Sequence, residues 1–507
     1  MAKQSSRSLW DFFSERRKTF SNNTMALHTG SGSLTYGELF ALSDSLARFL
    51  AARGVFDSDV VALTLPNTLA FVPSVLALVQ LNVTIALLSP KYGQNELMAI
   101  GRGIRPNFLL SGAAFARDFG RYLGVKKSEP VGGFPVLEEL ELTPLQHSDD
   151  AAGSVQYSSS AASIDHPALI KFTSGSTSEP KAIALSAANI LAETATIIDS
   201  LHYAPGDRLL GSVPLCHSYG FDLGVLGAVG SGATLVVQDS FVPRRVLTDL
   251  STLGITIFLG VPSMYRFLAD IAWTTPPNLS RIRYLLSCTA PLAPDLITAF
   301  HGRYGIPITQ HYGTSETGAI STHLPAEVLS RPESVGVAMS NVAVDIVDED
   351  GRSLRAGTEG EIVVTSRAVA RGYVMGQPGG LSPFRKEACY WTGDRGTMDG
   401  DGFIYVRGRV DDLINVGGFK VSPSEVTRVL QSDARVREAA VVGVKDSMGE
   451  ISVYAAVTLR QMVTETELLS FCRARLADYK VPRRIRICDE LPRGPSGKIR
   501  VRPEDVT

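Results

Sequence analysis

The sequence predicts an α/β protein in which a large N-terminal domain of layered sheets and helices is followed by a small α+β domain on a hinge. Three observations predict this fold. Short apolar runs alternate with helical patterns along most of the chain, which favours layered and largely parallel sheets. The charged, glycine-flanked segment at 408–412 then interrupts the alternation. The signals of two helices and two strands follow it, so we predict one domain over residues 1–410 and a second over 411–507.

The first strand–helix alternation lies between residues 33 and 88. Four leucines recur at helical spacing within 33–53, which predicts a turn and then a helix with that face in the core. The apolar stretch 71–88 is long enough to cross a membrane, but a helix followed by a buried strand explains its polar interruptions better. The leucines are Leu39, Leu42, Leu46 and Leu50, and the other elements predicted here are a strand over 60–65, a helix over 70–80 and a strand over 83–88.

Residues 141–167 differ from the segments on either side. They are rich in serine and poor in large apolar residues, so we predict an exposed loop. Regular structure returns with a short apolar strand over 168–172. Further along the chain we predict strands over 234–237, 256–259, 284–287, 361–364, 439–444 and 452–458, and helices over 424–431 and 465–476.

Composition narrows the class of protein. The chain has 507 residues, a formal net charge of −2 and a hydrophobic content of 44%, which is ordinary for a globular protein and gives no sign of nucleic acid as a partner. Its five cysteines are scattered without a CxxC pair, which argues against a disulfide framework or a zinc site and fits a reducing compartment, the cytoplasm. Charged residues near the N-terminus argue against a signal peptide, and no membrane span is expected.

The segment TSGSTSEPK at 173–181 carries the clearest chemical signal. It follows the strand predicted to end at Phe172, and its glycine and small hydroxyl residues can turn backbone N–H groups and hydroxyls toward a phosphate. The spacing is not that of a Walker A loop. Taken alone, the segment is explained equally well by a flexible serine-rich turn. The candidate phosphate-binding residues are Thr173, Ser174, Gly175, Ser176, Thr177 and the cationic Lys181.

Four more segments follow in order. They are QHYGTSETG at 310–318, YWTGD at 390–394, GRVDD at 408–412 and LPRGPSGKI at 491–499. Together with the loop at 173–181, they resemble the motifs of the adenylate-forming superfamily, which includes acyl-CoA synthetases, adenylation domains and luciferases. The resemblance covers nearly the whole chain and is greatest to the acyl-CoA synthetases. Ser178 and Ala182 stand where that family usually has glycine, and neither removes a phosphate-binding group.

The resemblance implies a role for each matched residue. An aromatic ring offers a stacking face, and the family places the tyrosine matched by Tyr312, next to Gly313, against adenine. Carboxylates accept hydroxyl donors and bind Mg²⁺. By resemblance, Ser315 contacts the α-phosphate, Glu316 binds the metal, Asp394 holds the ribose, Arg409 lies near ribose and phosphate, Asp411 is the hinge, and Lys498 bridges the acid carboxylate and the α-phosphate.

The segment PLCHSYG at 214–220 resembles the family segment that borders the acyl pocket. We see no acid–base partner for His217, so we expect a pocket or gate residue and not a general base. Amino-acid-activating relatives have an aspartate where this chain has Ser218, which favours a plain carboxylic acid, aliphatic or aromatic. Asp222, one helical turn on, either faces the pocket and fits a polar acid, or is a solvated or capping aspartate. The candidate acyl-pocket residues are His217, Ser218, Phe221, Asp222, Cys288 and Ala290.

The resemblance also implies a second half-reaction. In VGGFK at 416–420, Gly417 and Gly418 would leave room for a pantetheine arm after the small domain rotates, and Lys420 stands where synthetases often have an arginine. We therefore predict activation of a small carboxylic acid by ATP and Mg²⁺ to an acyl-AMP, release of pyrophosphate, and transfer to coenzyme A. The alternatives are the phosphopantetheine thiol of a separate carrier protein, an amine, and a nucleotide-binding relative without turnover.

Overall fold

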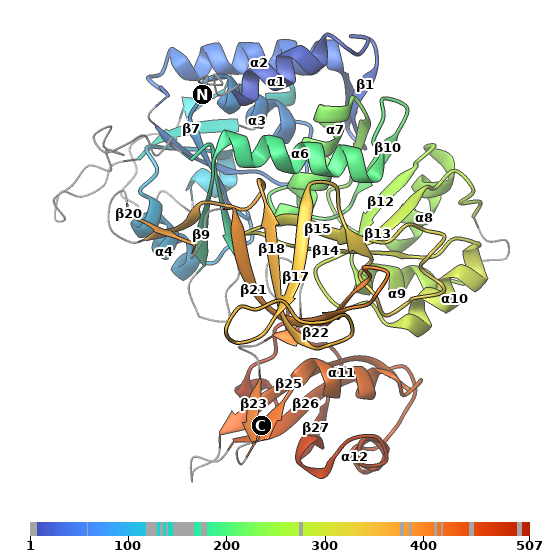
Figure 1. The fold of residues 1–507 in the computed structure, drawn as a ribbon. Coiled ribbons are helices and arrows are strands. Elements are labelled where there is room, and N and C mark those ends of the chain that lie inside the picture. Colours follow the sequence, from blue (N-terminus) through green and yellow to red (C-terminus); the bar gives the residue numbers. More distant parts are fainter. Residues whose placement is uncertain are drawn as a thin grey trace.

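The computed structural model has the predicted α/β architecture, with a large N-terminal part and a small C-terminal part below it (Figure 1). The described residues are 8–57, 59–117, 129–131, 135–137, 140–145, 167–173, 180–272, 277–375, 380–384, 388–409, 413–416, 419–445, 451–493 and 499–506.

Two nine-stranded sheets form the large part. In both, the inner strands are mostly parallel and the outer strands are antiparallel. The first sheet runs in the order β16 (Val337–Ala338), β15 (Gly318–Thr322), β14 (Thr309–Thr314), β13 (Tyr284–Ser287), β12 (Ile257–Gly260), β10 (Arg208–Gly211), β11 (Thr234–Val237), β1 (Met25–Thr29) and β2 (Gly32–Thr35). The second runs β20 (Gly380–Pro383), β19 (Gly372–Met375), β9 (Lys181–Leu185), β8 (Leu169–Thr173), β4 (Thr84–Leu87), β3 (Val60–Thr64), β5 (Phe108–Gly112), β7 (Leu140–Pro144) and β6 (Glu129–Pro130).

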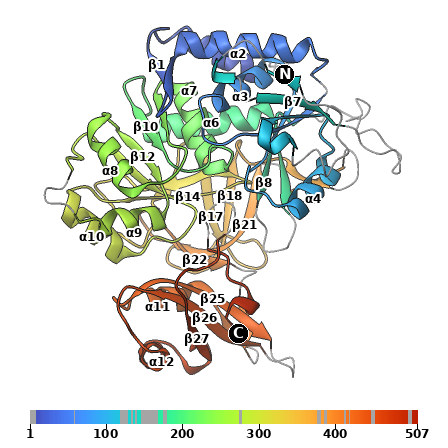
Figure 2. The same ribbon diagram turned by 180° about the vertical axis from the view of Figure 1, so that it is seen from behind.

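Helices lie between the two sheets and on their outer faces (Figures 1 and 2). Alternation of side chains along the strands explains this layering, because one face of each strand packs into the shared central core and the other face into an outer core. The central core contains α1 (Leu9–Arg17), α2 (Tyr36–Ala51), α3 (Phe71–Gln80), α6 (Ala187–Leu201), the π-helix η2 (Gly220–Leu226) and α7 (Gly227–Ser231); the outer cores contain α8 (Pro243–Thr252), α9 (Pro262–Asp270) and α10 (Pro294–Tyr304) on one side and α4 (Gln94–Ile104) on the other.

A third, antiparallel sheet completes the large part and leads to the small one. It consists of β17 (Val342–Val347), β18 (Gly360–Ser366), β21 (Cys389–Met398) and β22 (Ile404–Arg409). The C-terminal residues have a separate apolar core built from β25 (Val436–Lys445), β26 (Ile451–Leu459), β27 (Arg484–Ile487), α11 (Pro423–Gln431) and α12 (Glu465–Arg473), with the hairpin β23 (Ile414–Val416) and β24 (Phe419–Val421) beside it; the short 3₁₀ turns are Pro135–Leu137, Asp478–Lys480 and Pro503–Asp505.

Most predicted elements lie within a few residues of the observed ones, and two predictions are wrong. The turn predicted before α2 is the strand β2, which pairs with β1. The loop predicted over 141–167 begins as strand β7, which pairs with β5; residues 146–166 lie outside the described part of the chain. The leucine face of α2 is in the core as predicted, and all five cysteines are free. In the part of the chain that the structure describes, no helix has both the length and the apolar character that a bilayer crossing requires.

Candidate functional site

The predicted phosphate loop joins two antiparallel strands of the second sheet. β8 ends at Thr173 and β9 begins at Lys181, and these residues are partners in the ladder, so the loop leaves and re-enters the sheet at one point. Lys181 is exposed, and its Nζ lies 5.5 Å from the ring centroid of Tyr373 on β19. The other loop candidates, Ser174, Gly175, Ser176 and Thr177, are outside the described residues.

The second motif forms a tight hairpin between β14 and β15. Gly313 is required there because a Cβ at this position would lie 2.5 Å from the carbonyl oxygen of Gly318. Ser315 accepts a hydrogen bond of 2.8 Å from the Ser218 hydroxyl. Glu316 is 9% exposed, and the N–H of Ala370 donates to its carbonyl oxygen at 2.7 Å. The hairpin is therefore held on one side by the predicted acid segment and on the other by the segment before β19.

Asp394 bonds to two other predicted nucleotide-binding residues, Tyr312 and Arg409. Tyr312 Oη donates to Asp394 Oδ2 at 2.5 Å, and Arg409 Nη1 donates to Oδ1 at 3.2 Å. Burial, followed by the neighbouring Asp394 charge, raises the pKa of Tyr312, so its phenol stays protonated as a donor. A carboxylate oxygen can accept more than one hydrogen bond, so this group is chemically suited to hydroxyl donors.

Two tyrosines that the sequence motifs do not single out support Glu316. Tyr373 Oη donates to Glu316 Oε1 at 2.9 Å and lies 2.9 Å from Tyr390 Oη. Burial raises the pKa of both phenols, that of Tyr390 to about 12, so both are neutral at physiological pH. Tyr390 belongs to the YWTGD segment, but no spacing rule links it to Tyr373, because the contact depends on how β19 and β21 are placed in different sheets.

On the acid side, a helix that begins at Ser218 faces the end of β13. His217 is half-buried, and its backbone N–H donates to Pro214. Cys288 follows β13 and is 7% exposed, while Ala290 is exposed. The Ser218–Ser315 contact places this helix against the Glu316 hairpin.

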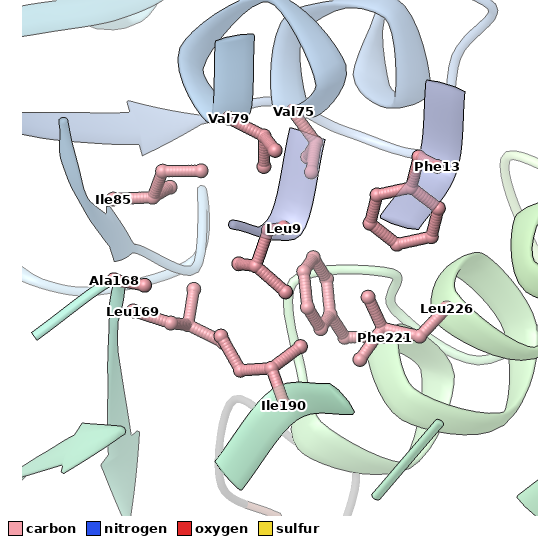
Figure 3. Close-up of a pocket in the computed structure, with 10 residues that line it drawn as sticks. All are labelled: Leu9, Phe13, Val75, Val79, Ile85, Ala168, Leu169, Ile190, Phe221 and Leu226. Carbon is pink, nitrogen blue, oxygen red and sulfur yellow. The ribbon is translucent and has the colours of Figure 1, made fainter. Parts of the chain in front are cut away.

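Phe221 and Asp222 do not lie where the predictions placed them. Phe221 packs into an apolar cavity of about 10 Å³ in the central core, with Leu9 and Leu226 (Figure 3). Asp222 is 2% exposed and bonds to Lys171 Nζ at 2.6 and 2.7 Å, so the solvated or capping interpretation is wrong. Both residues belong to η2, whose wider π-helical turns change the direction of side chains relative to α-helical spacing from Ser218.

Two buried charged residues near the hairpin, Lys171 and Glu193, were missed by the sequence reasoning. Glu193 Oε1 accepts the N–H of Ala319 at 2.8 Å, and Oε2 has no hydrogen-bond partner among the residues that the structure describes. The carboxyl lies against Gly318, where a Cβ would come within 2.1 Å of Oε2. Burial, followed by the Asp222 charge, raises the pKa of Glu193 to about 8, and Lys171 opposes this shift. The available sequence signal for Glu193 was one glutamate within a helical pattern. A glutamate in a helix is equally typical of an exposed position.

Thr289, in the loop after Cys288, has φ of 75°, a left-handed conformation that strains a β-branched residue. Thr289→Gly is expected to raise the free energy of unfolding by about 1 kcal/mol, because strain relief outweighs the greater entropy of glycine in the unfolded chain. Urea denaturation measures this change. Asn341, with φ of 63°, is the matched control, since asparagine tolerates this conformation and Asn341→Gly should change stability less. Equal changes in the two variants would contradict strain at Thr289.

Four predicted site residues lie outside the described ranges: the adenylation lysine Lys498, the hinge residue Asp411, and Gly417 and Gly418 of the second half-reaction. Lys420 lies in β24, where its backbone pairs with Asn415. Arg493 and Ile499, which flank the Lys498 segment, form an antiparallel bridge. Among the described residues, no cluster of three or more His, Cys, Asp or Glu could hold a metal alone.

This arrangement suits a polyanionic nucleotide. Mg²⁺ is usually bound by one or two carboxylates together with substrate phosphates, so Glu316 fits it without a larger acidic cluster. The chain also provides a carboxylate, Asp394, next to the cation of Arg409, and hydroxyl groups where the helix that begins at Ser218 contacts the hairpin. The groups that the structure brings together are Tyr312, Ser315, Glu316, Asp394, Arg409, Ser218, Thr173 and Lys181.

The family follows from the match of this chain to known domains. Residues 13–374 match the model of the AMP-binding enzymes, and residues 425–498 match that of the AMP-binding enzyme C-terminal domain. The chain therefore belongs to the AMP-binding enzymes. The predicted superfamily, the fold class and the enzyme class, an AMP-forming acid–thiol ligase, are confirmed.

Individual relatives share most of their length with this chain. An oxalate–CoA ligase of Arabidopsis thaliana is 30% identical over 501 residues, covering 96% of this chain and 95% of the relative. A feruloyl-CoA synthase of an Amycolatopsis species is 31% identical over 494 residues, covering 96% of each. Among solved structures, ATP-bound MatB of Rhodopseudomonas palustris has a TM-score of 0.82 at 25% identity, covering 97% of each chain. The amide bond synthetase McbA of Marinactinospora thermotolerans has a TM-score of 0.81 at 25% identity, covering 97% of this chain and 98% of McbA.

Proposed function

We propose that this enzyme uses ATP and Mg²⁺ to convert a small carboxylic acid into an acyl-adenylate, and then transfers the acyl group to coenzyme A. The observation that carries the proposal is the convergence of Glu316 and the Tyr312–Asp394–Arg409 group beside the strand ends that flank the loop at 174–179. These are separate segments of the chain, and each supplies a group that ATP needs.

In the proposed complex, adenine stacks on Tyr312 and the ribose hydroxyls bond to Asp394. Arg409, already paired with Asp394 at 3.2 Å, lies where it can also reach a phosphate. The hydroxyls and N–H groups of residues 173–177, with Lys181, hold the outgoing pyrophosphate. The described ends of this loop, Thr173 and Lys181, support that placement.

Glu316 is the proposed metal ligand. Its Oε1 is held by Tyr373, which fixes the direction of the carboxylate before the nucleotide binds. Mg²⁺ would neutralise part of the charge on the phosphates, so that a carboxylate can approach the α-phosphorus. Ser315 would donate to an α-phosphate oxygen, and Lys498 would bridge that phosphate and the acid.

The acid is proposed to lie between the Ser218 helix and the residues that follow β13. His217, Ser218, Cys288 and Ala290 are the proposed lining, and Phe221 is left out because it packs in the core. The acid attacks the α-phosphate in line, its oxygen–phosphorus bond forms, and pyrophosphate leaves with the electrons of the broken phosphoanhydride bond. The product is an acyl-AMP anhydride. In the second step a thiol sulfur attacks its acyl carbon, the thiol loses its proton, and AMP leaves with the electrons of the broken carbon–oxygen bond as the thioester forms.

For the second step, we propose rotation of residues 411–507 about Asp411, which would move Lys498 out and bring the 416–420 hairpin in. Gly417 and Gly418 would admit the pantetheine arm, with Lys420 near a phosphate. A separate carrier protein is the second acceptor, and an amine is the third, favoured by the similarity to an amide bond synthetase. Five free cysteines support a reducing compartment, so the cytoplasm is the proposed location.

ATP–pyrophosphate exchange over a panel of acids tests the first step, with oxalate, short aliphatic acids and ferulate included because relatives are named for two of them. Lys498→Ala is expected to abolish most exchange while ATP still binds. Exchange by no acid would refute the adenylation proposal. Formation of a thioester with coenzyme A or a carrier protein, or of an amide with an amine, then identifies the acceptor.

Tyr373→Phe tests the metal site without removing the ligand itself. Loss of a hydrogen bond to a charged carboxylate should raise the Mg²⁺ concentration needed for half-maximal ATP binding about tenfold. Calorimetric titration of ATP at several Mg²⁺ concentrations, with no acid present, measures it. Tyr405→Phe is the matched control, because that hydroxyl donates to Asp399 at 3.1 Å and not to Glu316. The same Mg²⁺ dependence in wild type and Tyr373→Phe would contradict a role for Tyr373 at the metal.

A further inference from the structure

Three ionisable side chains meet inside the large part of the protein, although none of them is needed for the proposed ATP contacts. The side chains of Lys171 and Asp222 are 4% and 3% exposed and form a doubly bonded ion pair. Glu193 is 2% exposed and interacts electrostatically with both. A buried cluster of this kind costs free energy of desolvation and therefore calls for a physical reason.

Each member of the cluster belongs to a different segment of the proposed site. Lys171 lies on β8, two residues before Thr173 at the start of the phosphate loop. Asp222 lies on η2, four residues after Ser218, which contacts Ser315. Glu193 lies on α6 and holds the N–H of Ala319, directly after the hairpin that carries Glu316. The phosphate, acid and metal segments therefore meet at one cluster.

Stability alone does not explain charged residues at this position. Replacing a buried ion pair by apolar residues of similar volume is often neutral or stabilising. The same three elements place Leu169, Ile190 and Phe221 in the adjacent apolar cavity, so this layer accommodates apolar side chains readily (Figure 3). What ionic hydrogen bonds add is a fixed distance and direction between the elements that carry them.

We infer that Lys171, Asp222 and Glu193 are positioning residues that hold β8, η2 and the Glu316 hairpin in one arrangement for adenylation. The inference rests on the proposed function. The Lys171–Asp222 pair holds η2 next to β8, the strand that leads into the phosphate loop. Glu193 sets the hairpin against α6, and Gly318 leaves the space that the carboxyl occupies. Small displacements of reacting groups have large effects on rate. By fixing the positions of these segments, the cluster therefore affects the rate of the chemical step.

The test removes both charges together, because Lys171→Met alone would leave Asp222 buried without a partner and could unfold the protein. The double variant Lys171→Met/Asp222→Asn is expected to fold and to bind MgATP within about twofold of wild type. Its kcat for acid-dependent pyrophosphate exchange should fall about 10- to 100-fold, through misplacement of the reacting groups. Circular dichroism and a cooperative melt check folding, and calorimetry checks nucleotide affinity.

A second ion pair gives a matched control. Asp207 accepts two hydrogen bonds from Arg283 at 2.6 and 2.7 Å, just before β10 and β13 and outside the proposed site. Arg283→Met/Asp207→Asn should change stability with kcat kept within about twofold of wild type. A wild-type kcat in Lys171→Met/Asp222→Asn would overturn the inference, whereas lack of exchange in the wild type would overturn the proposed function instead.

Hydrogen–deuterium exchange makes the inference testable without turnover. In the Lys171→Met/Asp222→Asn variant, the amides of β8 and of residues 312–319 should exchange faster than in wild type, because the cluster no longer holds them. The Arg283→Met/Asp207→Asn variant should leave these amides unchanged. Unchanged exchange of both segments in the first variant would show that the cluster does not position them.

Discussion

Substitution of Glu316 by glutamine is expected to lower kcat/KM for pyrophosphate exchange about 10³-fold, because one preorganised charged group in such a site contributes roughly 10²–10³ and the proposed metal affinity is lost with it. Glutamine retains the size of the side chain and an oxygen for the Tyr373 hydroxyl, which donates to Glu316 at 2.9 Å. The hairpin should therefore keep its position, and the effect should come from the missing charge.

The Mg²⁺ dependence separates this explanation from a general loss of structure. In the Glu316→Gln variant, the apparent affinity for ATP should depend less steeply on Mg²⁺ than in wild type, while melting temperature changes little. Glu359→Gln is the matched control, since that carboxylate pairs with Arg395 at 2.9 Å on the surface. A Glu316→Gln enzyme with exchange within about threefold of wild type would show that the metal is held elsewhere.

Glu316 could be recognised from the sequence as a site residue, whereas Tyr373 could not. Glu316 lies in a continuous motif, so the hydroxyl residues, the glycine and the carboxylate of that motif could be recognised together. Tyr373 reaches Glu316 from β19, 57 residues further on, through a contact between different strands. Sequence reasoning identifies local groups well, whereas partners supplied by the packing of distant elements require the structure.

The same limit applies to the core. Hydrophobic patterns located three strands of each nine-stranded sheet, because an apolar strand next to a helical repeat is a local signal. They did not show that Lys171, in the middle of the apolar strand β8, finds its partner on η2, 51 residues away. Asp222 was misjudged for the same reason. Its sequence neighbours suggested a helix surface, and only the sheet opposite explains why a charged residue is buried there.

Substitution of Glu193, the third member of the cluster with Lys171 and Asp222, should have the largest effect on stability. Glu193→Gln is expected to stabilise the protein at neutral and alkaline pH. In the folded enzyme burial raises the pKa of Glu193 from its ordinary value of 4.5 to about 8. In the unfolded chain the carboxyl ionises near its ordinary value. Between these two values the unfolded state has lost the proton and the folded state retains it, so rising pH favours unfolding.

The two pKa values of Glu193 set the pH range over which the wild-type enzyme loses stability. The wild-type contribution of Glu193 is most favourable below pH 4.5, decreases through the range up to about 8, and is constant above it. Glutamine has no proton to lose, and its amide oxygen can still accept the N–H of Ala319. The free energy of unfolding of Glu193→Gln should therefore exceed that of wild type by about 1 kcal/mol at pH 5 and by about 4 kcal/mol at pH 8, at roughly 1.4 kcal/mol for each pH unit above the ordinary pKa of the carboxyl.

Urea denaturation at pH 5, 6.5 and 8, with fluorescence of the large domain as the probe of unfolding, measures this difference in the free energy of unfolding. Glu129→Gln is the matched control, because that carboxylate is at the surface and pairs with Arg53 at 2.9 Å. Its stability relative to wild type should not change over the same pH range. A Glu193→Gln variant whose advantage is the same at pH 5 and pH 8 would mean that Glu193 is already ionised in the folded enzyme, with Lys171 as the counter-charge. The buried cluster would then carry a net negative charge at neutral pH, next to the hairpin where the nucleotide phosphates are proposed to bind, and its position there would oppose the reaction that it is inferred to support.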